Sequence, residues 1–310
     1  MTVGEAMVVF DPDSPGLLRH VDGFVKRVGG AELNVAVALA RLGHRVGLAG
    51  ALGDDEFGAQ IVSVLRGEGV DVDGVRFSAH APTGIYFKQR GAAGQLRVAY
   101  YRAGSAASRL RFEDLDLDPL LGAGVLHLTG ITAALSDACA DLVARLAAAA
   151  VDRGTLLSVD ANVRWSLLGD RDPRDVLAPL VERADLLFVS GEEADALFGA
   201  HDPEVLRDVV ARLRARTIVV HDGDGAWAVD ADGVTRRPAH AVTVVDAVGA
   251  GDAFVAGFLS GRLRGWDVGE CLALGNACGA CAVTLPGDAQ SMPTERDALA
   301  LLHAQPGRER

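Results

Sequence analysis

Short apolar segments of this chain alternate with longer amphipathic segments, and this alternation is the feature that most narrows its possible folds. Such a repeated alternation is typical of parallel strands connected by helices. Two amphipathic runs, residues 31–43 and 137–154, each end at a glycine, as helices often do. We therefore expect an α/β fold with a central, mostly parallel sheet flanked by helices. The predicted strands cover residues 45–52, 124–130, 156–162, 185–191 and 217–223.

One region departs from this alternation. Residues 83–102 are typical of a β-hairpin, because two β-rich arms flank a turn that contains glycine. Together with residues 17–28, this hairpin would form a small antiparallel sheet outside the main one. No long linker rich in Pro or Ser interrupts the chain, so we expect a single domain over residues 1–310, with lid segments at approximately 15–28 and 82–104.

The apolar side chains of this lid, Ile85, Phe87 and Val98, predict an oligomer. A small sheet leaves an edge and an apolar face that it cannot bury by itself. We therefore expect dimers or a higher oligomer that associate through the lid.

Composition and charge argue against several classes of partner. The 310 residues are 49% hydrophobic and 23% charged, which is typical of a globular protein. A formal net charge of −12 argues against nucleic acid and anionic membranes, because basic surfaces bind both. No apolar run reaches the ~18 residues of a membrane span, and the N-terminus lacks the basic flank of a signal peptide. We expect a cytoplasmic protein whose four cysteines stay reduced.

Polar side chains follow four of the short apolar runs, at the points where the predicted strands end. In an open parallel sheet, ligands bind in the crevice outside the carboxyl ends of the strands. Four such ends together favour a shared binding site. The residues concerned are Asp160, Asn162, Arg164, Ser190, Glu193, His221, Asp222, Gly223, Asp246 and Asp252.

The segment DAVGAGDAFVAG, residues 246–257, places two glycines directly before a predicted helix. Glycines allow a tight turn with converging amides, and the first turn of a helix leaves amides free. Together with the helix dipole, these amides make an anion-binding site. Asp252 would repel that anion, so its position makes sense if it acts as a general base toward a hydroxyl that attacks phosphorus. Taken alone, Asp252 would be interpreted as a helix N-cap.

Other nucleotide-binding signatures are absent from the sequence. It contains no Gly-x-x-x-x-Gly-Lys-[Ser/Thr] loop, no set of protein-kinase motifs and no Gly-x-Gly-x-x-Gly after the first strand. The last absence weakens the hypothesis of a dinucleotide-dependent oxidoreductase, which rests on the βα alternation alone.

Residues 246–254, DAVGAGDAF, resemble the C-terminal signature of the ribokinase/PfkB family of sugar kinases, Asp-Thr-x-Gly-Ala-Gly-Asp-x-Phe. Residues 29–43, GGAELNVAVALARLG, are similar to the N-terminal signature of that family, with its Gly-Gly pair and Asn34. The resemblance covers essentially the whole chain and implies a ribokinase-like α/β fold with a small β-sheet lid. Within the family, residues 100–108, YYRAGSAAS, and 160–164, DANVR, most resemble 2-keto-3-deoxygluconate kinases.

The resemblance implies a role for each residue that matches a family motif. Asp252 would be the catalytic base, and the amides of Gly249, Ala250 and Gly251 would stabilise charge on the transferred phosphoryl group. Glu193 would organise Mg²⁺ through water, and Asp246 would help to hold a monovalent cation such as K⁺. The residues expected at the sugar are Gly30, Asn34, Tyr86, Tyr100, Arg102 and Arg164. Those expected at ATP are Asn162, Ser190, His221, Gly223, Gly225 and Asn276.

Four features depart from the family pattern, all on the nucleotide or metal side. Ser190 replaces an Asn, Ala247 replaces a Thr, His221 replaces a common Lys, and the nucleotide loop is shortened to residues 223–225. These departures leave a catalytically weak sugar-binding relative as an alternative to the kinase. Among kinases, fructokinase, ribokinase and nucleoside-kinase specificities also stay open.

Two arginines narrow the predicted substrate. Arg102 and Arg164 would converge on the sugar in this fold, and two unpaired guanidinium groups beside a neutral sugar would be costly. A substrate carboxylate would pair with them through forked hydrogen bonds, unless either arginine pairs with a protein carboxylate instead. We therefore expect ATP-dependent phosphorylation of 2-keto-3-deoxygluconate, with its primary hydroxyl beside Asp252, to give the 6-phosphate.

Overall fold

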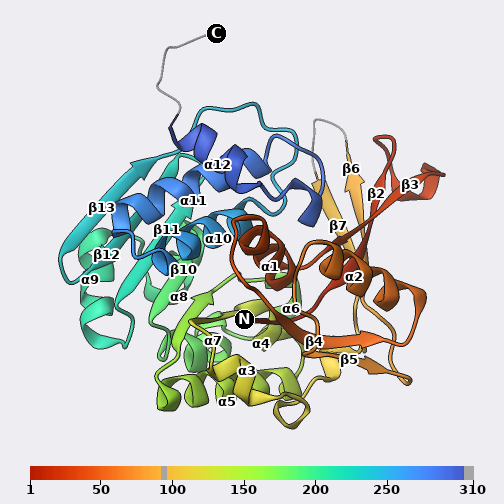
Figure 1. Cartoon of the computed structure of the whole chain (residues 1–310), viewed down its shortest axis with the longest axis horizontal. Coiled ribbons are helices and arrows are strands. Elements are labelled where there is room, and N and C mark those ends of the chain that lie inside the picture. The colour runs from red at the N-terminus through yellow and green to blue at the C-terminus, as the bar shows by residue number, and fades with distance from the viewer. Residues whose placement is uncertain (92–95, 304–310) are drawn as a thin grey trace.

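The computed structural model describes residues 1–91 and 96–303, and its centre is a nine-stranded sheet (Figure 1). The strand order is β13-β12-β11-β10-β9-β8-β1-β4-β5; β12 and β13 run antiparallel to their neighbours, and the other pairs are parallel. The five strands predicted from the sequence are present as β4, β8, β9, β10 and β11, which confirms the α/β prediction. The strands are β1 (Thr2–Val3), β4 (Leu48–Gly53), β5 (Val75–Ser78), β8 (Val125–Thr129), β9 (Leu156–Asp160), β10 (Leu186–Val189), β11 (Thr217–Asp222), β12 (Gly225–Asp230) and β13 (Gly233–Pro238).

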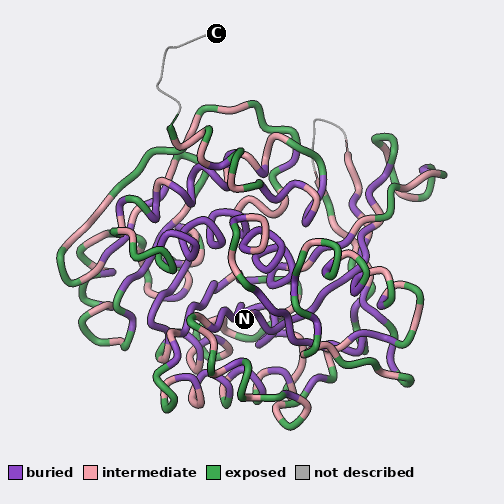
Figure 2. The backbone as a smooth tube through the Cα atoms, viewed as in Figure 1, coloured by how far each residue is buried: buried purple, intermediate pink, exposed green. Residues whose placement is uncertain are grey.

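Helices cover both faces of this sheet, so its central strands are apolar on both sides. In β10, Phe188 packs into one core, whereas its neighbours Leu187 and Val189 pack into the other. Figure 2 shows this burial along the sheet and the helices beside it. The helices are α1 (Ala31–Arg41), α2 (Glu56–Gly67), α3 (Leu117–Leu121), α4 (Gly130–Leu135), α5 (Asp137–Arg153), α6 (Trp165–Leu168), α7 (Pro173–Val181), α8 (Gly191–Phe198), α9 (Pro203–Arg212), α10 (Ala250–Leu263), α11 (Val268–Ala282) and α12 (Glu295–Leu302), with 3₁₀ turns at Leu18–His20, Ala107–Arg109, Phe112–Asp114 and Ala289–Ser291.

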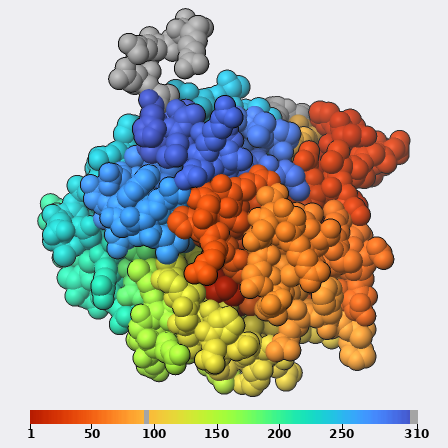
Figure 3. Space-filling model, viewed as in Figure 1, coloured from red at the N-terminus to blue at the C-terminus, as the bar shows by residue number. Residues whose placement is uncertain are grey.

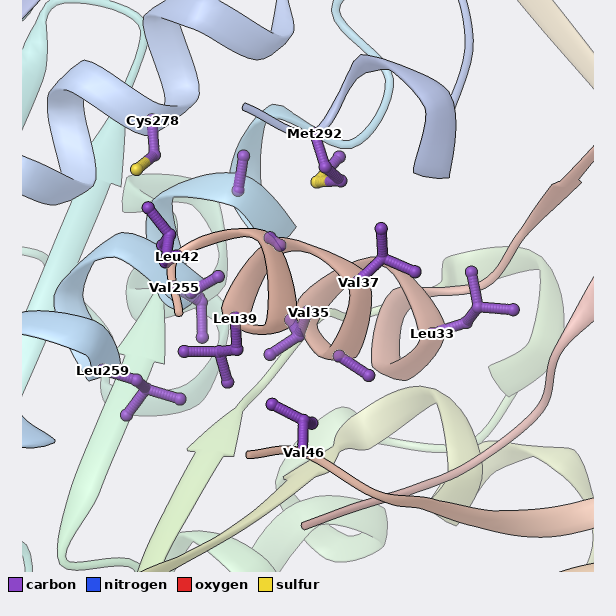
Figure 4. Close-up of a cluster of buried hydrophobic side chains, with 14 of the residues drawn as sticks. Leu33, Val35, Val37, Leu39, Leu42, Val46, Val255, Leu259, Cys278 and Met292 are labelled. Atoms are coloured by element: carbon purple, nitrogen blue, oxygen red, sulfur yellow. The ribbon is translucent and has the colours of Figure 1, made fainter. Parts of the chain in front are cut away.

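Helix α1 is buried along most of its length and forms the centre of one of these cores (Figure 4). Its side chains Leu33, Val35 and Leu39 point in different directions, because the helix packs against the sheet and against α10 at the same time. Val255 and Leu259 of α10 belong to the same core. A helix that is apolar on most sides is stable only when it is buried in this way.

A second sheet of four strands, in the order β3-β2-β6-β7, stands beside the large one (Figure 1). Strands β6 (Ile85–Arg90) and β7 (Leu96–Tyr101) form the predicted hairpin, and β2 (Met7–Pro12) and β3 (Phe24–Gly29) form a second hairpin. Figure 3 shows the β2–β3 hairpin, in red, projecting at the edge of the molecule. The prediction of a fully antiparallel sheet was wrong, because β2 pairs parallel with β6.

The N-terminal apolar segment contributes to both sheets, which the sequence pattern did not indicate. Strand β1 belongs to the large sheet and β2 belongs to the lid. Glu5 lies between the two strands and is buried. The crossing from one sheet to the other therefore brings a charged residue into the interior.

Within residues 1–91 and 96–303, no helix combines the length and the apolar character that a membrane crossing requires. All four cysteines are free thiols, and Cys139, Cys271 and Cys278 are buried. Burial raises the pKa of these three thiols, so they are poor nucleophiles at neutral pH.

Candidate active site

The carboxyl ends of β9, β10 and β11 meet the start of α10 at a cavity of about 400 Å³. Strand β7 of the lid closes one side of this cavity with Val98 and Tyr100, so both sheets contribute to it. This is the crevice in which open α/β sheets bind ligands. Of the residues predicted from the sequence, the structure brings together here Tyr100, Asn162, Arg164, Ser190, Glu193, His221, Gly249, Gly251 and Asp252.

Asp252 lies in the first turn of α10 and is only 8% exposed. Its Oδ2 accepts a hydrogen bond of 2.7 Å from Nδ2 of Asn34 on α1, so the two sequence motifs meet at this contact. Burial raises the pKa of Asp252 to about 7, although the Asn34 hydrogen bond and the charge of Arg164 oppose the shift. A carboxylate with a pKa near neutrality is suited to accept a proton at physiological pH.

The Gly-Ala-Gly turn before Asp252 requires glycine at its first position. Gly249 is the N-cap of α10, and its φ of 80° lies in the left-handed region that side chains rarely adopt. A Cβ there would also lie 2.8 Å from Cε of Met292. The amide of Ala250 donates to the Ala247 carbonyl over 3.3 Å, which leaves those of Gly249 and Gly251 as the better-placed anion donors of the turn.

Three carboxylates gather at the cavity. Glu193, in the first turn of α8, accepts hydrogen bonds from the amides of Val163 (2.6 Å) and Ser190 (2.8 Å). Asp160, at the end of β9, is buried; burial, followed by the charges of Glu193 and Asp252, raises its pKa well above its usual range. The cavity therefore holds more negative charge than its own surroundings stabilise, and this favours a bound cation.

Arg164 is the positively charged side chain that faces these carboxylates at the cavity. It is exposed, and it forms no ion pair with any residue that the structure describes. Asn162, two residues before it, has a φ of 37°, and its backbone amide donates to Oδ1 of Asp160 over 3.0 Å. This turn directly follows β9 and places Arg164 at the rim of the cavity.

The oxygen donors at the cavity suit Mg²⁺, although they do not form a closed protein cage. Among the described residues, no group of three or more His, Cys, Asp or Glu side chains is arranged to hold a metal ion. Mg²⁺ usually keeps several waters and binds through one or two carboxylates together with substrate phosphates. Glu193 and Asp160 fit an ion held in this way, and the role of Glu193 at Mg²⁺ stays a prediction.

A second cavity, of about 530 Å³, shares part of its lining with the first. Gly251, Ala247 and His221 line both cavities. The His221 ring stacks on Phe254 with centroids 4.9 Å apart, and burial lowers its pKa, so the imidazole is neutral at pH 7. Its Nε2 is buried and has no hydrogen-bond partner within the described part of the chain, so it is available to a ligand.

Of the other residues predicted at ATP, Gly223 and Asn276 line this second cavity. Asn276 of α11 donates to the carbonyls of Arg237 and Pro238, each over 3.0 Å, and thereby fixes the end of β13 at the rim. Gly225 is not among the residues that line the cavity. It begins β12, and a Cβ there would lie 2.5 Å from the Arg237 carbonyl, so strand packing explains this glycine.

On the side predicted for the sugar, Asn34 and Asp288 each present a buried oxygen. Oδ1 of both residues has no hydrogen-bond partner among residues 1–91 and 96–303. Asp288, which the sequence analysis missed, accepts a hydrogen bond from the Tyr86 hydroxyl, and burial raises its pKa. Tyr100 packs beside Tyr86 with ring centroids 5.4 Å apart. These polar groups are suited to bind hydroxyl groups of a ligand.

The structure revises the prediction that Arg102 faces the substrate. Arg102 is buried, and its Nε donates to Oε2 of Glu5 over 2.6 Å within an ion pair. The other oxygen of Glu5 accepts a hydrogen bond of 2.6 Å from Ser105. Gly30 packs against the same segment, because a Cβ there would lie 2.3 Å from the Glu5 carbonyl. Of the two arginines predicted at the substrate, Arg164 is thus the one without an ion-pair partner among the described residues.

Asp246, predicted to hold a monovalent cation, forms ion pairs with the lid. Its Oδ2 lies 3.2 Å from Nζ of Lys88 and 3.2 Å from Nη2 of Arg90, both on β6. Its Oδ1 accepts a hydrogen bond of 3.1 Å from the amide of Val248. Asp246 therefore connects the lid to the turn that precedes α10.

Comparison with known proteins agrees with this geometry. Residues 1–295 match the pfkB family carbohydrate kinase domain. The chain belongs to this family of carbohydrate kinases. It is 38% identical over 309 residues to the 2-dehydro-3-deoxygluconokinase of Thermoproteus tenax, an alignment that covers 98% of this chain and 94% of the relative. It is 35% identical over 319 residues to Fructokinase-1 of Oryza sativa subsp. japonica, an alignment that covers 98% of this chain and 97% of that relative.

Among solved structures, a ribokinase II from E. coli in complex with ATP and Mg²⁺ is similar to this pfkB family kinase. The TM-score is 0.89 at 25% sequence identity, and the match covers 97% of each chain. The predictions of a ribokinase-like fold and of a phosphotransferase that acts on a carbohydrate alcohol are thereby confirmed. Family membership also removes the hypothesis of a dinucleotide-dependent oxidoreductase.

The burial of Asp252 predicts a pH-dependent cost in stability. Its pKa is about 7 in the folded protein against 3.8 for an ordinary Asp, so the folded state retains a proton that the unfolded state releases. The favourable contribution of protonated Asp252 to the free energy of unfolding is therefore lost as the pH rises from about 4 to 7, and the folded protein becomes less stable over this range. We expect the Asp252→Asn variant to be more stable than wild type at pH 8 by on the order of a few kcal/mol.

Urea unfolding at pH 5, 6, 7 and 8 measures this difference, which should grow with pH. The Asp208→Asn variant, which neutralises an exposed carboxylate on α9, controls for the loss of one negative charge. A difference between Asp252→Asn and wild type that stays constant with pH would contradict the elevated pKa.

Proposed function

We propose that this kinase phosphorylates a 2-keto-3-deoxy sugar acid, above all 2-keto-3-deoxygluconate, on its primary hydroxyl to give the 6-phosphate. The observation that carries the proposal is the guanidinium of Arg164, which lines the cavity and has no ion-pair partner in the described part of the chain. A carboxylate binds such a group through forked, charge-assisted hydrogen bonds. The similarity to a 2-dehydro-3-deoxygluconokinase supports the same choice.

The substrate would extend across the cavity from Arg164 to Asp252, because both residues line it. A 2-keto-3-deoxy sugar acid has a carboxylate at one end, which would pair with Arg164, and a primary hydroxyl at the other, which would donate to Asp252. The Oδ1 atoms of Asn34 and Asp288, which have no hydrogen-bond partner in the described part of the chain, would accept hydrogen bonds from its hydroxyl groups. Tyr100, from the lid, would cover the bound sugar acid.

ATP with Mg²⁺ supplies the phosphoryl group in this proposal. Asp252 accepts the proton of the attacking hydroxyl, and the Asn34 hydrogen bond holds its carboxylate in place. The amides of Gly249 and Gly251 stabilise negative charge on the transferred group. Because Asp252 must be deprotonated to act as a base, kcat/KM should rise as the pH passes through about 7.

The second cavity is our proposed position for ATP. The ring of His221 on Phe254 forms part of its wall, and Gly223 and Asn276 lie at other sides. Because the two cavities share Gly251, the terminal phosphate would reach the Gly-Ala-Gly turn. Mg²⁺ would be held through water by Glu193 together with Asp160.

The second candidate function is that of a fructokinase, because the chain is 35% identical to the rice Fructokinase-1. Fructose, ribose or a nucleoside would leave Arg164 without a counter-charge, so we prefer the sugar acid. A catalytically weak sugar-binding relative is disfavoured because Asp252, its Asn34 partner and the Gly-Ala-Gly turn are all in place. We also propose a cytoplasmic location, in which the four free thiols stay reduced.

Replacing the proposed base should stop turnover without abolishing sugar binding. We expect Asp252→Asn to reduce kcat at least about a thousandfold, while sugar affinity stays within about tenfold of wild type. ADP release measures turnover, and calorimetric titration with the sugar acid measures binding. An Asn variant that retains more than about a tenth of the wild-type kcat would show that Asp252 is not the base.

The charge of Arg164 should determine the preference for sugar acids. We expect Arg164→Ala to lower kcat/KM for 2-keto-3-deoxygluconate by about 2–3 kcal/mol, a factor of roughly 30–150, and to change kcat/KM for fructose and ribose much less. Arg174→Ala, which removes an exposed arginine on α7 that pairs with Asp172, is the matched control. A wild-type preference for fructose, or an equal loss for all three sugars, would contradict the carboxylate assignment.

We propose that two copies of the chain associate through the outer face of the lid. On this face the rings of Phe10 and Phe87 stack 4.8 Å apart, and the ring of Tyr101, which lies against Phe87, belongs to a residue that is 65% exposed. Exposed apolar groups on a small sheet favour burial against a second sheet.

Light scattering should give a mass of about twice 32.2 kDa for the wild type at micromolar concentration. Tyr101→Asp should shift that mass toward the monomer, because a charge would be buried in the interface. Phe77→Asp, at an exposed aromatic residue on β5 of the large sheet, is the control. A monomeric wild type would exclude this association.

A further inference from the structure

Lys88 is one of only two lysines in a chain that contains 28 arginines, and its side chain is entirely buried. It comes from β6 of the lid and points toward the loops of the large sheet. A buried ammonium group is costly unless opposite charges and hydrogen bonds compensate for its lost hydration. The surroundings of Lys88 therefore need to be unusually well matched to a positive charge.

Three oxygen atoms surround this ammonium group. Nζ of Lys88 lies 3.2 Å from Oδ2 of Asp246, 3.5 Å from Oδ2 of Asp288 and 3.5 Å from the carbonyl oxygen of Gly287. Carboxylate and carbonyl oxygens are also the donors that bind hard metal cations. The chain thus builds a small cation site from oxygens of loops outside the lid and fills it with a side chain from the lid.

A free monovalent cation, which the family resemblance predicts at Asp246, does not fit these residues. Oδ2 of Asp246 already faces both Lys88 and Arg90 at 3.2 Å, and Oδ1 accepts the hydrogen bond of Val248. An ion such as K⁺ would share this carboxylate with two fixed positive charges. Like charges at such short range, in a buried place, repel one another strongly.

We propose that the ammonium group of Lys88 serves as a built-in cation in place of K⁺, so that phosphoryl transfer by this enzyme needs no free monovalent cation. Lys88 is a positioning residue that acts through Asp246. That carboxylate holds the amide of Val248, directly before Gly249 of the turn expected to bind the transferred phosphoryl group. The inference rests on the kinase activity of the family and does not depend on which sugar is the substrate.

The choice of lysine in an arginine-rich chain supports this role. An ammonium group is a compact point charge with donors in several directions, like a bound alkali ion, whereas guanidinium is a planar fork. The nearby Arg90, whose side chain is 28% exposed, is at the margin of the site, and Lys88 is at its centre. The other lysine, Lys26, is exposed on β3 and makes no ion pair within the described residues.

The first experiment measures ADP release and the melting temperature of the wild type with K⁺ replaced by choline at constant ionic strength. We expect the rate to change by less than about twofold and the melting temperature to stay the same, because a cation that does not bind cannot stabilise the folded state. A loss of more than about tenfold in rate without K⁺, or a melting temperature that K⁺ raises specifically, overturns the proposal.

The second experiment creates a requirement for an external cation. In choline, Lys88→Ala should lose at least about tenfold in kcat, and K⁺ or methylammonium should restore part of the rate and raise the melting temperature. Choline is too large to enter the space left by the side chain. Lys26→Ala is the matched control and should behave as the wild type does.

Lys88→Met, which keeps an apolar stem of similar length, repeats the test if the alanine variant does not fold. A wild-type rate in choline for both Lys88 variants, or a loss in both that neither K⁺ nor methylammonium reduces, overturns the proposal. The melting temperatures answer the question without any turnover. If no sugar or sugar acid yields ADP under any cation, the proposed substrate fails while the melting data still decide whether Lys88 replaces K⁺.

Discussion

The hydrogen bond between Asn34 and Asp252 depends on the packing of two buried helices, α1 and α10. The rest of the site depends on the same packing. Helix α10 lies between α1 and α11, and close approach on the α11 side is possible because Gly257 and Gly261 have no side chains. A Cβ at Gly257 would lie 2.8 Å from Sγ of Cys278. Close packing of α10 against α11 therefore helps to fix the start of α10, where the turn and the base are located.

The charges at this site are arranged for bound ligands and are unfavourable for the protein by itself. Asp160, Glu193 and Asp252 gather where Arg164 is the opposing charge that lines the cavity. Burial raises the pKa values of Asp160 and Asp252, and the charges of neighbouring carboxylates raise both further. Charged groups that destabilise the protein without its ligands are typical of active sites, because the arrangement that catalysis requires lowers the stability of the fold. A divalent cation and a hydroxyl that donates its proton would both relieve this repulsion, so the same charges that weaken the fold favour the reactants.

The parts of this architecture that local patterns specify could be predicted from the sequence, and the parts that rest on distant pairing could not. Strand and helix positions follow from the alternation of apolar runs, and the place of Asp252 follows from the glycines directly before its helix. Nothing near Arg102 indicates that Glu5, 97 residues earlier, neutralises it. Likewise, sequence patterns show that Asp246 ends an apolar run, but only the fold shows that a lysine of the lid reaches it.

Strand β6 connects the position of the lid to the catalytic turn, because alternate residues along it all contact carboxylates outside the lid. Tyr86 donates to Asp288, and Lys88 and Arg90 both pair with Asp246. Rotating the whole lid away would separate these groups and leave buried charges unpaired, at a cost of several kcal/mol. Because the other oxygen of Asp246 holds the turn before Asp252, any displacement of β6 that does occur also displaces the groups expected to bind phosphate. Strand β7 is not held in this way at the cavity, where Tyr100 lines the wall and stays 40% exposed.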